Sequence, residues 1–245
     1  MEGPGSNWTI VHTKLGTVLI DAGYPADAGL VTQSIRATGA APDSLTFILV
    51  THAHTDHIGG IPALLARVPD ATVLCAPAEL LATRGPDREQ ITVATAGIRN
   101  LVKPRFARWA LRAIRAGATR PLEIPSAEAF TRAQLAALSI RDHAAPGHTQ
   151  GSTMFELVGD NTYVTGDAVV TDHPTYASPR VGAIDAHFSS DDQAAQLAAR
   201  SLPDDVTILP GHGPALLRPT PTPRTAPEQQ APSPGIRLDL SRSTY

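Results

Sequence analysis

The sequence has one cysteine, no excess of basic residues and no long apolar run, and each shortage argues against a class of protein. A lone cysteine cannot form an internal disulfide, so nothing here requires an oxidising compartment. Cys75 lies in an apolar stretch, where we expect a small buried side chain rather than a nucleophile. The formal net charge is −3 at pH 7, whereas a general nucleic-acid-binding protein normally carries a clear basic excess.

No apolar run approaches the ~20 residues that span a bilayer. The first residues, Met1 to Asn7, contain no basic segment followed by an apolar stretch, so we see no signal peptide. We therefore expect a cytoplasmic protein that acts on a small molecule, with no nucleic-acid partner and no stable membrane insertion.

The 245 residues alternate strand and helix patterns, which is typical of an α/β fold. Residues 46–50 are apolar on both faces, which favours a central strand. The patterns predict strands at 8–12, 17–21, 46–50, 72–75, 138–143, 153–158, 162–165 and 206–209, and helices at 26–38, 61–67, 104–116 and 190–201. Ser189 or Ser190 is the expected N-cap of the last helix. Residues 1–218 are predicted to form the catalytic domain, and the proline-rich residues 219–245 a disordered tail.

Residues 84–125 are rich in arginine and differ in character from the rest. Within them, 104–116 has the spacing of an amphipathic helix, with Phe106 and Trp109 on its apolar stripe. This helical insertion is either a lid over a functional site or a helix packed on the core. Attachment to a membrane surface is a weaker third interpretation.

Residues 51–60 read Thr-His-Ala-His-Thr-Asp-His-Ile-Gly-Gly and follow the predicted strand 46–50 directly. The spacing His-x-His-x-Asp-His does not fit one face of a helix. On a loop that leaves a strand, however, it can direct all four side chains to one point. Imidazole nitrogen and carboxylate oxygen are ligands that zinc accepts.

Three further loops each place one such ligand beside a glycine. His148 follows Gly147, Asp167 follows Gly166 at the end of a predicted strand, and His212 lies between Gly211 and Gly213. Strand ends are where α/β proteins build their sites. The four loops together predict a metal site.

This joint pattern resembles the metallo-β-lactamase superfamily over about residues 8–213. The resemblance implies an αβ/βα sandwich, in which two mixed β-sheets face each other in four layers with the helices outside. It also implies a first metal held by His52, His54 and His148, and a second by Asp56, His57 and His212, with Asp167 bridging. Asp21 matches the family's Asp-x-Gly loop, where it either orients a ligand or is a simple turn residue.

The resemblance implies a hydrolase with two zinc ions, or iron or manganese, in which a metal-bound hydroxide attacks a carbonyl. Asp56 then passes a proton towards the leaving group. True β-lactamases of the family usually lack the bridging aspartate, glyoxalase II enzymes add a C-terminal helical domain, and lactonases for acyl-homoserine lactones have tyrosine where this chain has Val170. An ester, thioester or lactone remains the expected substrate. The alternatives are an enzyme similar to the mononuclear iron persulfide dioxygenases, or β-lactam hydrolysis as a side activity. A non-catalytic binding protein on the same fold is a third and weaker interpretation.

Four other histidines and a tyrosine lie outside this pattern. His12 and His143 are expected to be structural. His173, Tyr176 and His187 belong to residues 171–189, which should overhang the site. A contact with substrate from one of these three is open, although solvent exposure is the expectation for each.

Overall fold

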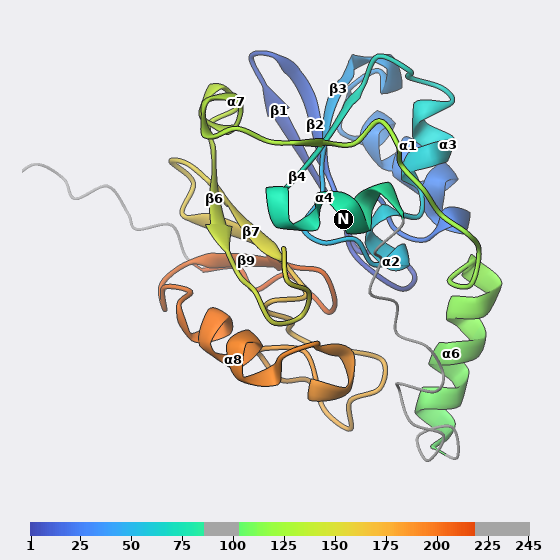
Figure 1. The fold of residues 1–245 in the computed structure, drawn as a ribbon, viewed down its shortest axis with the longest axis vertical. Helices are drawn as coiled ribbons and strands as arrows, with labels where there is room; N and C mark the ends of the chain where they lie inside the picture. The colour runs from blue at the N-terminus through green and yellow to red at the C-terminus, as the bar shows by residue number, and fades with distance from the viewer. Residues whose placement is uncertain (86–102, 219–245) are drawn as a thin grey trace, which may run out of the picture.

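The computed structural model describes residues 1–85 and 103–218, which form two β-sheets packed face to face with helices on the outside (Figure 1). The first sheet contains, in spatial order, β1 (Thr9–Thr13), β2 (Gly16–Ile20), β3 (Leu45–Leu49), β4 (Thr72–Cys75) and β5 (Glu128–Ala129). The second contains β6 (Ile140–Ala144), β7 (Thr153–Leu157), β8 (Thr162–Gly166) and β9 (Thr207–Pro210).

The direction of the strands decides which loops meet. In the first sheet β1 is antiparallel to β2, while β2, β3, β4 and β5 run parallel. In the second sheet β6, β7 and β8 alternate in direction, but β9 runs parallel to β8. Because parallel neighbours end at the same edge, the segments after β2 and β3 lie together, and so do those after β8 and β9.

The core forms in layers because successive side chains of a strand point to opposite faces. Between the sheets, Ile20, Leu49 and Leu74 meet Phe155 and Val164. The alternate residues of the first sheet pack instead under α1 (Ala28–Ala37) and α3 (Ile61–Leu65). On the far side, α8 (Asp192–Arg200) covers the second sheet. The predicted four-layer αβ/βα sandwich of two mixed sheets is confirmed.

Most predicted elements appear within a few residues of their expected bounds, and Cys75 is fully buried. The sequence patterns did not indicate the short elements α2 (Thr55–Ile58), α4 (Leu80–Arg84), β5 and α7 (Arg132–Ala137). The predicted helix 104–116 is α6 (Pro104–Ala116), which stands beside the sandwich rather than on a sheet (Figure 1). Residues 86–102 of the insertion and the predicted tail 219–245 lie outside the described residues. None of the helices in the described ranges is long and apolar enough to span a bilayer.

The predicted N-cap of α8 is wrong. Asp191, not Ser189 or Ser190, caps the helix, since its Oδ1 accepts a hydrogen bond from the Ala194 N–H at 3.0 Å. The Ser190 hydroxyl instead donates to Gly147 O at 3.1 Å, which ties the start of α8 to the loop of His148.

We expect Asp191→Ala to lower the free energy of unfolding by about 1 kcal/mol, because the first turn of α8 loses its cap. Ser189→Ala is the control, since no described residue hydrogen-bonds its hydroxyl, and its cost should be about 0.5 kcal/mol or less. Urea unfolding of both variants measures the difference. A larger cost for Ser189→Ala would place the cap at that residue instead.

Candidate metal centre

The seven predicted ligand side chains meet at the edge between the two sheets, although four separate segments carry them. His52 and His54 lie on the segment after β3, and Asp56 and His57 on the short helix α2. The remaining three come from the second sheet: His148 from the β6–β7 connection, Asp167 from the end of β8 and His212 from the end of β9. All are buried except Asp56, whose side chain is 17% exposed.

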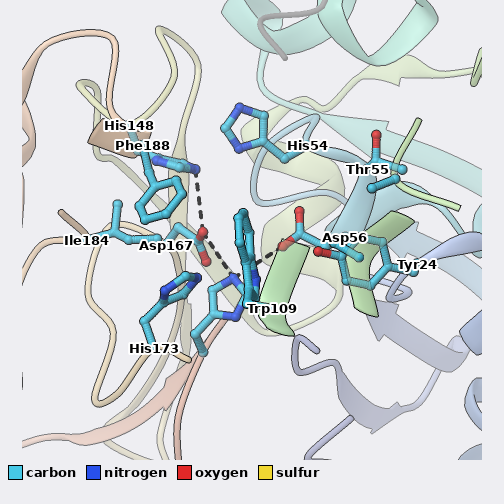
Figure 2. A pocket seen from close by; sticks show the side chains of 13 residues that line it. Tyr24, His54, Thr55, Asp56, Trp109, His148, Asp167, His173, Ile184 and Phe188 are labelled. Carbon is cyan, nitrogen blue, oxygen red and sulfur yellow. Dashed lines mark ion pairs between the residues drawn. The ribbon is translucent and has the colours of Figure 1, made fainter. Parts of the chain in front are cut away.

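The ligand atoms fall into three groups, and the atoms of each group lie within 4.8 Å of one another. The groups are His52, His54 and His148; His52, His57 and Asp167; and Asp56, His57 and His212. The first and third match the two metal positions expected from the sequence. Asp167 lies between them, with Oδ2 at 3.5 Å from His148 Nε2 and 3.3 Å from His212 Nε2. Figure 2 shows this carboxylate directed into the space that the histidines surround.

The side chains are directed towards shared points in that space rather than towards one another. His57 Nε2 lies 3.2 Å from Asp167 Oδ1, yet neither atom forms a hydrogen bond with any described residue. Buried polar atoms without partners are rare, and an ion is one of the few reasons for them. His52 Nε2 and His148 Nε2 lie 3.0 Å apart, which is the spacing expected of two nitrogens that face one cation. The residues present therefore fit a pair of divalent ions.

The direction of the pKa shift divides the histidines of the site into two groups. Burial lowers the pKa of His52 and His148, with neighbouring histidines acting in the same direction, so that His148 falls to about 3. Burial opposes protonation of His57 and His212 too, but Asp167 and nearby carboxylates outweigh it. The pKa of His57 is thereby raised well above its usual value and that of His212 to about 9. A divalent ion would replace these protons, because imidazole binds metal in its neutral form.

Asp21 holds His57 from outside the ligand set. Its Oδ2 accepts a hydrogen bond from His57 Nδ1 at 2.8 Å and one from Thr51 Oγ1 at 2.7 Å, and its Oδ1 accepts one from Thr51 N at 2.9 Å. Asp21 has a φ of 60°, a conformation that residues other than glycine adopt where their surroundings require it. These contacts favour the orienting role over the simple turn residue, and they leave His57 Nε2 facing the site.

Glu79, which the sequence analysis did not identify, connects ligand loops of the two sheets. Its Oε1 accepts a hydrogen bond from Ala53 N at 2.7 Å, between His52 and His54. Its Oε2 accepts hydrogen bonds from Gly151 N and Thr149 Oγ1, both at 2.9 Å, next to His148. The carboxylate therefore sets the distance between the loops that carry the first group of ligands.

The N-terminal segment connects the other ligand loops in a similar way. Gly5 O lies 2.9 Å from His212 Nδ1, and Ser6 Oγ donates to Asp56 O. Asn7 Nδ2 donates to Pro210 O and Gly213 O, on either side of His212. Gly5 O thus orients His212, since a carbonyl on one ring nitrogen directs the other towards a metal.

Five of the seven ligands form the floor of a cavity whose lining also includes Trp109 of α6 and Tyr24, Ile184 and Phe188 (Figure 2). These five are His54, Asp56, His148, Asp167 and His212. The Trp109 ring lies 5.5 Å from that of Phe188. The insertion helix therefore lines the site, although its Phe106 is also buried against residues 170–188. Trp109, Ile184 and Phe188 make this side of the cavity apolar.

The expectation of solvent exposure is wrong for two of the three polar residues in segment 171–189. His173 and Tyr176 are buried, and His173 lines the cavity with its ring 4.9 Å from that of His212. Burial lowers the pKa of His173 to about 3, and His212 adds to the effect. His187 is exposed, as expected. His12 is exposed on β1, and His143 bonds Glu156 on the second sheet, so neither is among the seven.

Comparison with known proteins agrees with this fold. The family model of the metallo-beta-lactamase superfamily matches residues 1–212. The crystal structure of TTHA1623 in a di-iron-bound form has a TM-score of 0.56 and 25% identity, covering 88% of this chain and 91% of that one. The fold and the site define the class of this protein: a two-sheet sandwich with a buried site of histidine and aspartate side chains. The chain belongs to the metallo-beta-lactamase superfamily.

Two curated relatives match a shorter segment. A hydroxyacylglutathione hydrolase of Enterobacter sp. is 38% identical over 66 residues, 27% of this chain and 24% of its own length. The atrochrysone carboxyl ACP thioesterase of Aspergillus fumigatus is 38% identical over 77 residues, 29% of this chain and 18% of its own length. The matched segment thus spans about a quarter or less of each relative.

We expect Asp21→Asn to weaken zinc binding about 10- to 100-fold, because an amide cannot accept all the hydrogen bonds that Asp21 accepts. The control is Asp27→Asn, another buried carboxylate near the site, which accepts a hydrogen bond from Tyr24 N and forms none with the seven ligands. Competition with a chromophoric chelator measures both affinities. Equal affinities would show that Asp21 does not orient His57.

Proposed function

We propose that this protein is a metal-dependent hydrolase with two ions, most simply zinc, which acts on an ester, thioester or lactone. The observation that carries the proposal is the pair of ligand groups joined by Asp167 at the floor of a cavity. His52, His54 and His148 would hold one ion, and Asp56, His57 and His212 the other. Residues 1–218 would form the catalytic domain, with α6 as the described part of a lid.

When bound, such ions supply a Lewis acid and lower the pKa of coordinated water to near 7. The chain's own residues complete the site. Asp167 would hold the two positions at a fixed separation. Asp56 is the most exposed of the ligands and lines the cavity, so its free oxygen would carry a proton to the leaving group.

The relatives support hydrolysis of an acyl bond. Their names describe a hydroxyacylglutathione hydrolase and an ACP thioesterase, so both act on acyl compounds. The apolar wall of Trp109, Ile184 and Phe188 suits the acyl part of such a substrate. The di-iron form of TTHA1623 supports a two-metal site and makes iron an alternative to zinc.

The test is a panel of lactones, thioesters, esters, β-lactams and phosphodiesters assayed with metal-loaded protein. We expect turnover of at least one acyl substrate, with most activity lost in Asp167→Ala because both ions lose a ligand. Circular dichroism should show that this variant keeps its fold. Wild-type turnover by Asp167→Ala would show that Asp167 is not a ligand.

Elemental analysis of protein purified without added metal should give about two ions per chain, mainly zinc. The reason is the ligand chemistry, since five imidazoles and two carboxylates suit zinc in both groups. One iron per chain, together with oxygen consumption on a persulfide, would instead identify a mononuclear dioxygenase and reject the hydrolase.

Trp109→Ala should lower kcat/KM by about 10-fold for substrates with a bulky acyl group and have little effect on acetyl substrates, because it removes part of the apolar wall. Leu111→Ala is the matched control, since Leu111 lies on the same helix with its side chain 49% exposed. Metal content and melting temperature are measured in parallel. A sharp fall in melting temperature with an equal loss for all substrates would show that α6 is core structure rather than a lid.

A further inference from the structure

His173 lines the same cavity as the candidate ligands but belongs to none of the three ligand groups. It follows β8 and is 2% exposed. Its ring packs between Phe188, at 4.9 Å, and His212, at 4.9 Å, with Trp109 at 5.6 Å. Figure 2 shows it beside Asp167 at the rim of the same cavity.

Hydrogen bonds within its own loop fix which ring nitrogen carries the proton. The Thr175 N–H donates to His173 Nδ1 at 3.3 Å, and Thr175 Oγ1 lies 2.7 Å from the same nitrogen. A nitrogen that accepts a backbone N–H bears no proton, so in the neutral ring Nε2 bears it. No described residue accepts a hydrogen bond from Nε2.

The structure therefore places a donor in the lining of the cavity, with no acceptor among the described residues. This nitrogen is not among the fully buried atoms, so water can accept its hydrogen bond in the free protein and a ligand oxygen can take the place of that water. The aromatic rings around it restrict the imidazole to one orientation. An oxygen of an acyl substrate held over the ligands is the acceptor that this arrangement suits.

We propose that His173 is a catalytic residue whose Nε2–H donates a hydrogen bond to the carbonyl oxygen of the substrate. The bond would strengthen as negative charge develops on that oxygen, which lowers the barrier. The proton stays on Nε2 throughout, so His173 is neither a ligand nor a general acid. This inference rests on the proposed hydrolase function and adds one residue to it.

Two substitutions separate a donor from a packing residue. His173→Phe keeps a flat ring among Trp109, Phe188 and His212 but has no N–H. His173→Gln keeps an amide N–H at a similar distance from the backbone. His187→Phe is the matched control, because His187 is an exposed histidine of the same segment.

With zinc-loaded protein and the best panel substrate, His173→Phe should lower kcat about 100- to 1000-fold. KM should change little, and His173→Gln should recover at least about 10-fold of the loss. Zinc content and melting temperature should match the wild type in all three variants. If His173→Phe keeps wild-type kcat, or if its loss follows loss of zinc, the proposal is overturned.

A binding measurement keeps this test separate from the test of the hydrolase itself. Phenylphosphonate offers tetrahedral oxygens and an aromatic ring, and calorimetry measures its binding to zinc-loaded protein without turnover. His173→Phe should bind it about 10- to 100-fold more weakly than the wild type, as expected for a hydrogen bond to a charged group. Equal binding by both, or none by the wild type, counts against the proposal.

Nitrogen NMR of labelled histidine rings adds an observation that needs no ligand. We expect the His173 resonances to show a proton on Nε2 and none on Nδ1. A proton on Nδ1 would contradict the proposal, even if the protein hydrolyses an acyl substrate. Conversely, failure of the whole panel with the expected tautomer and binding would reject the hydrolase but leave the donor in place.

Discussion

Five imidazoles and two carboxylates share one buried site, and the rest of the structure depends on keeping them there. Burial disfavours each charged form, and the histidines oppose one another's protonation. Left to themselves, such groups would collapse into ion pairs or turn outward to water. Instead, hydrogen bonds on their outer sides hold several of them in place: Thr51 on His52, Asp21 on His57 and Gly5 O on His212. The orientation of the site is thus set by residues that do not face it.

These outer contacts also join parts of the chain that are far apart in sequence. Glu79, after β4, bonds the segment of His52 and the segment of His148, which come from different sheets. Asn7 bonds both sides of His212. The two sheets share an apolar core, and at the polar edge of the site these bonds connect them as well. The bonds that hold the ligand loops therefore also contribute to the docking of the sheets.

The ligand residues were predictable because their chemistry appears in the sequence as short patterns: histidine or aspartate beside glycine at the end of an apolar strand. Glu79 and residues 5–7, which contact the ligand loops, gave no such signal in the sequence. Their roles arise only where distant segments of the chain meet. Helices α2, α4 and α7 were missed because four to six residues are too few to show helical periodicity. His173 was expected at the surface, and only the packing of α6 and Phe188 over it explains its burial. The cap of α8 was misplaced because serine and aspartate are equally good caps, and the fold selects between them.

The cavity combines two parts with different origins. Its floor belongs to the sandwich, where strand ends fix the ligands of the proposed hydrolase. Its wall comes from α6, which connects β4 to β5, and from the segment 171–189, which connects β8 to α8. Connections can vary without disturbing the sheets, so substrate choice can change while the ligand set stays the same. Trp109 and His173 lie on these two connections and touch each other at the cavity. In the proposed hydrolase, apolar selection by one and a hydrogen bond from the other would therefore act on the same acyl group, which would locate specificity at the contact between α6 and segment 171–189.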